Sequence, residues 1–154
     1  MKDKKQIGFS HLFPLIEEKI ENGGKFTFTA FGNSMQPYLK NGKHRVTLSP
    51  IKNKLRIGDI IFYRRKDGSF VLHRVVKIKN GITYFCGDNQ FFLEPHTNTV
   101  QSIAILTNIE YNGRSRDPFG FGSRLWCAIL PIRRFSLRAL HFIKHRIVTS
   151  NSNR

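Results

Sequence analysis

The sequence predicts a mainly β domain with a short helix before the strands and a basic helical extension after them. Apolar and polar residues alternate with a period of two through the centre of the chain, as in half-buried strands. Asp67-Gly68 and Asn80-Gly81 are dipeptides favoured where hairpin turns need positive φ. Strands do not alternate with helices as in parallel α/β folds, and 154 residues suffice for one domain.

The individual elements follow from local patterns. Ile16 and Ile20 lie on one helical face, Ser10 can cap the start and Gly23-Gly24 can end it, so residues 10–21 are expected to be helical. Within the β domain, assigned to residues 1–112, strands are expected from Lys25 on and at Arg45–Leu48, Asp59–Arg64, Phe70–Lys79, Ile82–Cys86 and Val100–Tyr111.

Residues 113–154 are predicted to form a linker and a basic amphipathic tail. The linker is expected at 114–122 and a helix at 123–148, interrupted or kinked near Pro131. No acidic residue follows Asp117. The helix either docks on an anionic membrane or packs on the β-core with a solvated basic face. Its apolar stripe is expected to comprise Leu125, Ile129, Ile132, Leu140, Ile143 and Ile147.

Composition limits the partners and the compartment. Lys and Arg total 26 against 10 acidic residues, a net charge of +16 that predicts attraction to an anionic partner. No recognisable nucleic-acid-binding motif accompanies this charge, so no specific nucleic acid is expected. The two cysteines, Cys86 and Cys127, form no disulfide framework, which favours a reducing compartment. Without a signal-peptide h-region or a run of about 18 apolar residues, a cytoplasmic location is expected, with peripheral contact at the inner membrane face as an extension of it.

Three short segments carry chemistry: 31–37, 72–76 and 86–89. They offer the Ser34 hydroxyl in a turn, the His73 imidazole in mid-strand and the Asp88 carboxylate after a strand. A Ser hydroxyl needs a neighbouring base to become a nucleophile, and a carboxylate can orient that base. No cofactor is expected. No metal is expected either, because the spacing of His73, Cys86 and His96 matches no common site.

In this order, and together with Gly58-Asp59, these segments resemble the signal peptidase I and LexA-type serine peptidase superfamily. The similarity is greatest to the branch with His as base, the endoplasmic reticulum and archaeal signal peptidases. It covers roughly residues 26–106 and rests on a Ser-Met-x-Pro, a Gly-Asp, a His-Arg-Val and a Gly-Asp-Asn motif, which are Ser34-Met35-Gln36-Pro37, Gly58-Asp59, His73-Arg74-Val75 and Gly87-Asp88-Asn89.

The resemblance implies a signal-peptidase/LexA-like antiparallel β-fold and a serine endopeptidase that cleaves a precursor or leader peptide after small residues. Ser34 would be the nucleophile and His73 the general base. The third triad member would be Asp88, which we favour slightly, or Glu94, while Asp59 would shape a strand start.

One departure supports an alternative function. Many family members have a small hydroxyl residue two positions before the nucleophile, where it helps to form the oxyanion hole, and here that residue is Gly32. The membrane anchor and the DNA-binding headpiece of relatives are not expected either. The alternative is therefore an inactive family member that binds peptides or a membrane surface.

Overall fold

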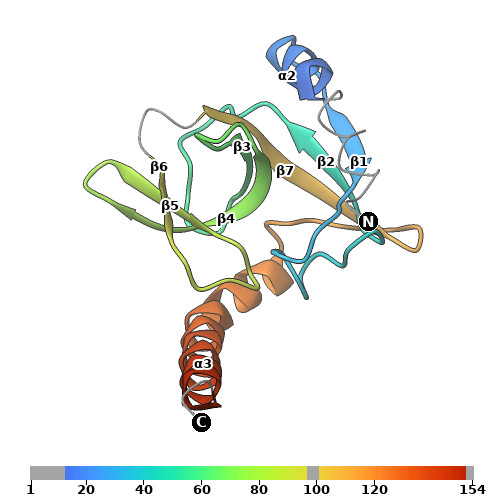
Figure 1. Cartoon of the computed structure of the whole chain (residues 1–154). Coiled ribbons are helices and arrows are strands. Elements are labelled where there is room, and N and C mark those ends of the chain that lie inside the picture. Colours follow the sequence, from blue (N-terminus) through green and yellow to red (C-terminus); the bar gives the residue numbers. More distant parts are fainter. Residues whose placement is uncertain (1–12, 97–100, 152–154) are drawn as a thin grey trace.

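One antiparallel sheet forms the body of the protein in the computed structural model, which describes residues 13–96 and 101–151 (Figure 1). Ser10 and Val100, expected in a helix and a strand, lie outside these ranges. Along the chain the elements are α2 (Phe13–Glu21), β1 (Phe26–Thr29), β2 (Arg45–Ser49), β3 (Ile60–Arg64), β4 (Phe70–Lys79), β5 (Ile82–Cys86), β6 (Glu94–His96), β7 (Gln101–Tyr111), β8 (Arg114–Arg116) and α3 (Phe121–Asn151).

The strands lie in the order β1-β2-β7-β3-β4-β5-β6, and β8 pairs with β7. The prediction of a mainly β fold with a helix at each end is therefore confirmed. β4 and β5 have the predicted bounds, and β2, β3 and β7 differ from theirs by one residue. Arg114–Arg116, expected to begin a linker, instead continues the sheet as β8. β6 was not predicted.

The two expected turns join β3 to β4 and β4 to β5. Asn80 and Gly81 have φ values of 51° and 74°, and Gly68 has a φ of 81°. Such angles favour Gly and Asn and match the twist of paired strands. The first hairpin fixes the register so that Ile61 lies opposite His73. This register decides which side chains share a face with His73.

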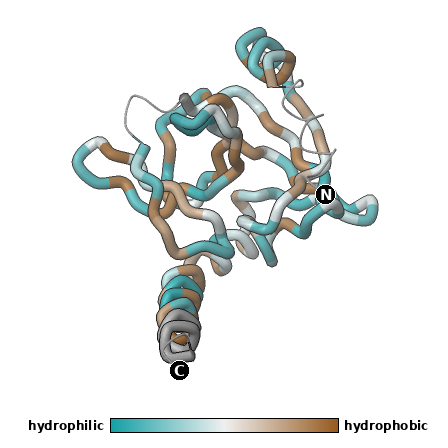
Figure 2. The backbone as a smooth tube through the Cα atoms, viewed as in Figure 1, coloured by the Kyte–Doolittle hydropathy of each residue, from teal (hydrophilic) through white to brown (hydrophobic). Residues whose placement is uncertain are grey.

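Two apolar clusters occupy different faces of the strands. Ile60 and Phe62 belong to the larger cluster, which also holds the buried residues of α2 and of the loop after β1. Ile61 and Tyr63 belong to the smaller one, with Val75 and Phe85. Because successive side chains of a strand point to opposite faces, this alternation is the physical reason for the predicted period of two. Figure 2 shows hydrophobic and hydrophilic residues interleaved along the strands.

Helix α3 runs without interruption from Phe121 to Asn151 with Pro131 inside it, so the predicted interruption is wrong, whereas the kink, which was the other possibility at Pro131, stays a prediction. Proline inside a helix removes one backbone hydrogen bond, and here the helix continues through that position. Its first turns pack on the body through Ser123 and Leu130, which are buried, and its later turns lead away from the sheet (Figure 1). Within residues 13–96 and 101–151, no helix has the length and apolar character needed to cross a membrane.

Candidate active site

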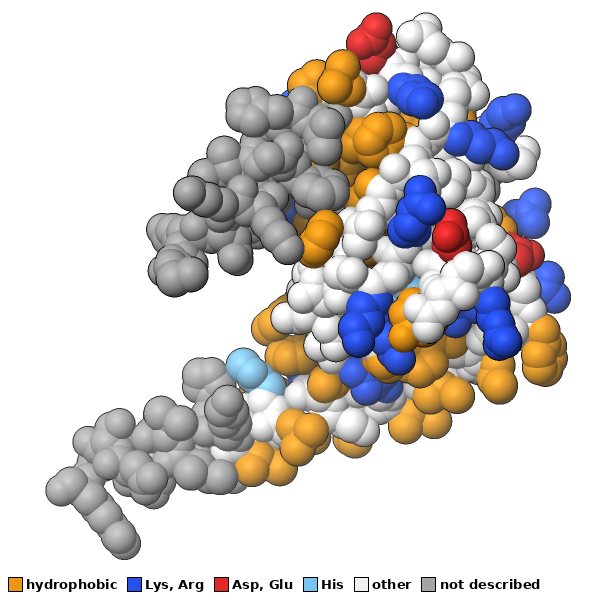
Figure 3. All heavy atoms as spheres, turned by 90° about the vertical axis from the view of Figure 1, so that its right-hand side faces the viewer, with side chains coloured by type: hydrophobic (Ala, Val, Ile, Leu, Met, Phe, Trp, Pro, Cys, Tyr) orange, Lys and Arg blue, Asp and Glu red, His pale blue; other side chains and the backbone are white. Residues whose placement is uncertain are grey.

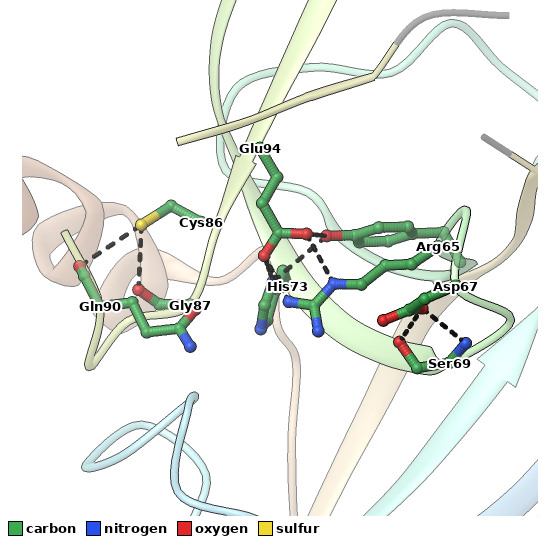
Figure 4. Close-up of polar contacts among 9 residues, drawn as sticks. Arg65, Asp67, Ser69, His73, Cys86, Gly87, Gln90 and Glu94 are labelled. Carbon is green, nitrogen blue, oxygen red and sulfur yellow. Dashed lines mark hydrogen bonds and ion pairs between the residues drawn. The ribbon is translucent and has the colours of Figure 1, made fainter. Parts of the chain in front are cut away.

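His73 lies in the middle of β4, and its side chain is only 1% exposed. Its Nδ1 atom is 3.2 Å from Glu94 Oε1. Glu94 is the first residue of β6, which pairs with β5 next to β4. Two strands that are not neighbours in the sheet therefore bring an imidazole and a carboxylate together, as Figure 4 shows.

Two further side chains hold the Glu94 carboxylate. Tyr63 donates its hydroxyl to Glu94 Oε2 at 2.9 Å, and Arg65 Nε donates to the same oxygen at 2.7 Å. A second Arg65 nitrogen binds Oε1. Burial alone would raise the pKa of Glu94, but the hydrogen bonds from His73, Arg65 and Tyr63 outweigh it and hold the pKa well below its usual range. Glu94 is thus anionic throughout the neutral pH range.

The Glu94 contact fixes the orientation of the His73 ring. A neutral imidazole carries one proton, and a carboxylate beside Nδ1 favours the tautomer that has it there. The Tyr63 hydroxyl, 3.3 Å from Nδ1, lies on the same side of the ring. In that tautomer Nε2, on the other edge of the ring, carries the lone pair. This is the protonation state that a general base requires.

Ser34 lies in the loop between β1 and β2, and that loop is fixed on both sides. Met35 and Leu39 are buried in the larger apolar cluster. The Ser34 carbonyl accepts a 2.8 Å hydrogen bond from the Asn89 backbone N–H. A Cβ atom on Gly87 would lie 2.6 Å from that carbonyl oxygen, so this close approach requires glycine.

These contacts place the Ser34 backbone against the Gly87–Asn89 segment, which directly follows β5. Cys86, immediately before Gly87, lies opposite Arg74 in the β4–β5 register, and Arg74 follows His73. In the described part of the chain, no internal hydrogen bond engages either the hydroxyl or the backbone N–H of Ser34. None joins Ser34 to His73 either. The loop is thus held through its carbonyl while its two donors stay available.

Asp88 has a different set of partners from Glu94. Its carboxylate is fully buried. It accepts hydrogen bonds from Arg74 Nε at 2.9 Å, from Arg74 Nη2 at 2.8 Å and from the Trp126 indole N–H at 2.8 Å. Arg74 is 1% exposed. Burial alone would lower the pKa of Arg74, but the hydrogen bonds and charge of Asp88 more than offset it and raise the pKa. Arg74 and Asp88 therefore form a buried salt bridge.

The structure assigns the contact with His73 to Glu94 and not to Asp88, the carboxylate that the sequence favoured slightly. The reason is the strand period: His73 and Arg74 are neighbours on β4 and point to opposite faces. Asp88 binds the arginine on one face, and Glu94 binds the histidine on the other. Asp88 still helps to position the Ser34 loop, because the backbone N–H of the next residue, Asn89, donates a hydrogen bond to the Ser34 carbonyl.

The Gly58-Asp59 motif forms the turn into β3. The Asp59 carboxylate accepts a 2.7 Å hydrogen bond from the Arg56 N–H, which matches the expected role in shaping a strand start. The Gly58 carbonyl accepts a 3.0 Å bond from Arg74 Nη1. This motif therefore joins the same buried arginine that binds Asp88.

Gly32 has a φ of 104°, which L-residues with a side chain rarely adopt. A Cβ atom at this position would meet nothing within 4 Å, so the restriction comes from the backbone and not from lack of space. The missing hydroxyl two residues before Ser34 thus accompanies a loop conformation that favours glycine.

Two cavities lie near these residues. One of about 260 Å³ is lined by residues that include Tyr63, Phe85, Glu94 and His96, but by neither His73 nor Ser34. Another of about 630 Å³ lies beside Gly58 and Cys127, and neither Ser34 nor His73 lines it. Across the described ranges, no group of three or more His, Cys, Asp or Glu side chains is placed to hold a metal ion.

Sequence reasoning missed Tyr63, Arg65 and Trp126. The first two could have been found from the hairpin register, because residues 61, 63 and 65 share the face on which His73 lies. No local signal pointed to Trp126, because its contact with Asp88 spans 38 residues.

Comparison of the chain with protein-family models and with curated proteins finds no match.

Loss of the Asp88 charge is expected to lower the stability of the fold. Asp88→Asn leaves Arg74 buried without a counter-charge, so we expect the free energy of unfolding to fall by about 3–5 kcal/mol. Urea denaturation followed by circular dichroism measures it. Asp67→Asn, in an exposed turn, is the matched control and should leave stability essentially unchanged. Equal stability of the Asp88 variant and the control would contradict the assigned role of the salt bridge.

Proposed function

We propose that the protein is a serine endopeptidase related to the signal peptidases, with Ser34, His73 and Glu94 as its triad. The observation that carries the proposal is the contact between His73 Nδ1 and the ionised Glu94 carboxylate at 3.2 Å. A buried histidine whose Nδ1 is held by a carboxylate, with Nε2 directed away from it, is the arrangement that activates serine nucleophiles.

The motif order supports the same proposal. The Ser34 loop, the Gly58 turn, β4 and the Gly87–Asn89 segment converge through contacts that Arg74, Asp88 and Asn89 make. The antiparallel sheet agrees with the signal-peptidase/LexA-like fold that the resemblance implies. Residues far apart in the sequence thus meet in one place.

In the proposed mechanism, Ser34 Oγ attacks the scissile carbonyl carbon while His73 Nε2 takes the hydroxyl proton. The proton then passes to the leaving amine, the peptide C–N bond breaks, and an acyl-Ser34 ester remains. Water, activated by His73, hydrolyses the ester. Glu94 stays ionised and stabilises the imidazolium. The Ser34–His73 hydrogen bond forms with bound substrate, since such bonds often tighten only in the Michaelis complex.

The backbone N–H of Ser34, which has no internal acceptor in the described chain, would donate to the oxyanion. Gly32 supplies no hydroxyl for a second donor, and loss of one such donor costs about 2.7–4 kcal/mol in comparable sites. The proposed enzyme is therefore slow. The proposed substrate is a precursor or leader peptide with small residues before the cut, processed in the cytoplasm.

A second candidate, an inactive family member that binds peptides without cleaving them, is favoured by Gly32 alone. It differs from the peptidase in one measurable property, which is whether the Ser34 hydroxyl is activated.

A fluorophosphonate probe tests that property without a known substrate. Activated Ser34 Oγ displaces fluoride from phosphorus, and peptide mass mapping locates the adduct. We expect labelling of Ser34 in the wild type and loss of labelling in Ser34→Ala and His73→Gln, each shown to be folded by circular dichroism. Ser115→Ala, an exposed serine of β8, is the control and should label normally.

The same variants are then incubated with a pool of precursor and leader peptides and analysed by mass spectrometry. Cleavage that requires both Ser34 and His73 would support the peptidase and define its cleavage rule. Absence of both labelling and cleavage in the wild type would support the inactive binding module, and labelling that persists in His73→Gln would refute His73 as the base.

Glu94 and Arg65 are expected to affect catalysis to different extents. Glu94→Gln removes the charge that favours the reactive tautomer, so kcat should fall by up to about 10⁴-fold. Arg65→Gln should lower kcat less, with KM unchanged, because Arg65 only positions Glu94. Glu110→Gln, which breaks an exposed ion pair with Arg45, is the control. A Glu94 variant as active as this control would rule Glu94 out of the triad.

A further inference from the structure

Helix α3 exposes an apolar face on the side away from the body. Its members, here called the outer face, are exposed large hydrophobic residues with exposed fractions between 45% and 83%: Phe121, Leu125, Ile129, Ile132, Phe135, Leu140, Phe142 and Ile143. The first five follow at intervals of three or four residues, so they lie on one side of the helix. The predicted stripe is therefore present from Leu125 to Ile143, where it points to solvent, and the side chain of Ile147 lies outside the described part of the chain.

The opposite side of α3 is committed to the body. Ser123 and Leu130 are buried, Trp126 binds Asp88, and Arg133 donates to the Asp88 carbonyl and the Asn89 side chain. These residues are again spaced by three or four. The helix cannot turn its outer face inwards without losing these contacts. The helix therefore packs on the body, as one of the two predicted possibilities has it, but it does so through this side and not through the apolar stripe.

Positive charge accompanies the outer face. Arg124 and Arg138 are exposed on α3, and the chain has no acidic residue after Asp117. Figure 3 shows hydrophobic side chains along the lower edge of the molecule, on the arm that α3 forms and under the body. A surface that fits this helix must accept apolar side chains and carry negative charge beside them.

We propose that α3 docks flat on an anionic lipid surface, with the outer face in the boundary between headgroups and acyl chains. An amphipathic helix with large apolar residues on one side and arginines beside them is the form that binds such an interface. Both features are satisfied by one occupant. A phospholipid surface offers an apolar phase for the hydrophobic residues and anionic headgroups for Arg124 and Arg138.

Other occupants satisfy only one feature. A second copy packed helix to helix would cover the apolar residues but would bring the arginines of both copies together with no acidic residue from α3 between them. A nucleic acid would neutralise the arginines but leave the eight apolar side chains exposed. The lipid surface is thus the occupant that the charges favour.

Vesicle flotation of the full chain tests the proposal, with phosphatidylcholine vesicles that either contain or lack phosphatidylglycerol. We expect binding to the anionic vesicles and little to the neutral ones. Arg124→Gln and Arg138→Gln should each weaken binding to anionic vesicles by about fivefold at low ionic strength. Combined Leu125→Ser, Ile132→Ser and Phe135→Ser should weaken it at least about tenfold.

Leu15→Ser, an exposed apolar residue of α2, is the matched control and should bind as the wild type does. Trp126, the only tryptophan, packs on Tyr38, so its unchanged emission shows that α3 stays docked in each variant. Equal binding to neutral and anionic vesicles, or wild-type binding by the triple variant, would overturn the proposal. So would a stable dimer in sedimentation that the triple variant abolishes, because the outer face would then belong to a second copy.

Discussion

The salt bridge between Arg74 and Asp88 is the interaction on which the rest of the site depends. Charges buried this completely are tolerated only when nearly all their hydrogen-bonding groups are used. Here Arg74 also binds the Gly58 carbonyl, and its guanidinium lies 4.4 Å from the centre of the Tyr38 ring. Asp88 binds Trp126. One ion pair thus joins the Ser34 loop, the turn into β3, β4 and α3.

The strand period divides the work between the two carboxylates. His73 and Arg74 are consecutive on β4, so their side chains leave the strand on opposite faces. The arginine face needs an anion to compensate a buried charge, and Asp88 fills that need. The histidine face needs an anion that fixes a tautomer, and Glu94 does this while Arg65 and Tyr63 keep it ionised. One carboxylate cannot contact side chains on both faces of β4. His73 and Arg74 therefore need two different acidic residues.

Sequence patterns predicted the fold where a period or a turn dipeptide was present. β4 and β5 were placed to the residue because Asn80-Gly81 marks the turn between them. β6 and β8 have three residues each, too few to show a period. The sequence also pointed to His73 and to two candidate acids, but the choice between them depends on sheet pairing, as β6 brings Glu94 alongside β5. The stripe on α3 was visible in the sequence, but its outward direction was not. The spacing of apolar residues shows which of them share one side of a helix, but it does not show what that side contacts.

That direction follows from the site itself. Trp126 and Arg133 reach Asp88 and Asn89 from one side of α3, and Asn89 in turn holds the Ser34 carbonyl. A helix that places these two side chains on the body must present the residues about half a turn away to solvent. Ile132 and Phe135 occupy that side. The exposed apolar face is therefore the geometric counterpart of the contacts that position the serine loop, and a surface that binds the face would bind the element that orders the site.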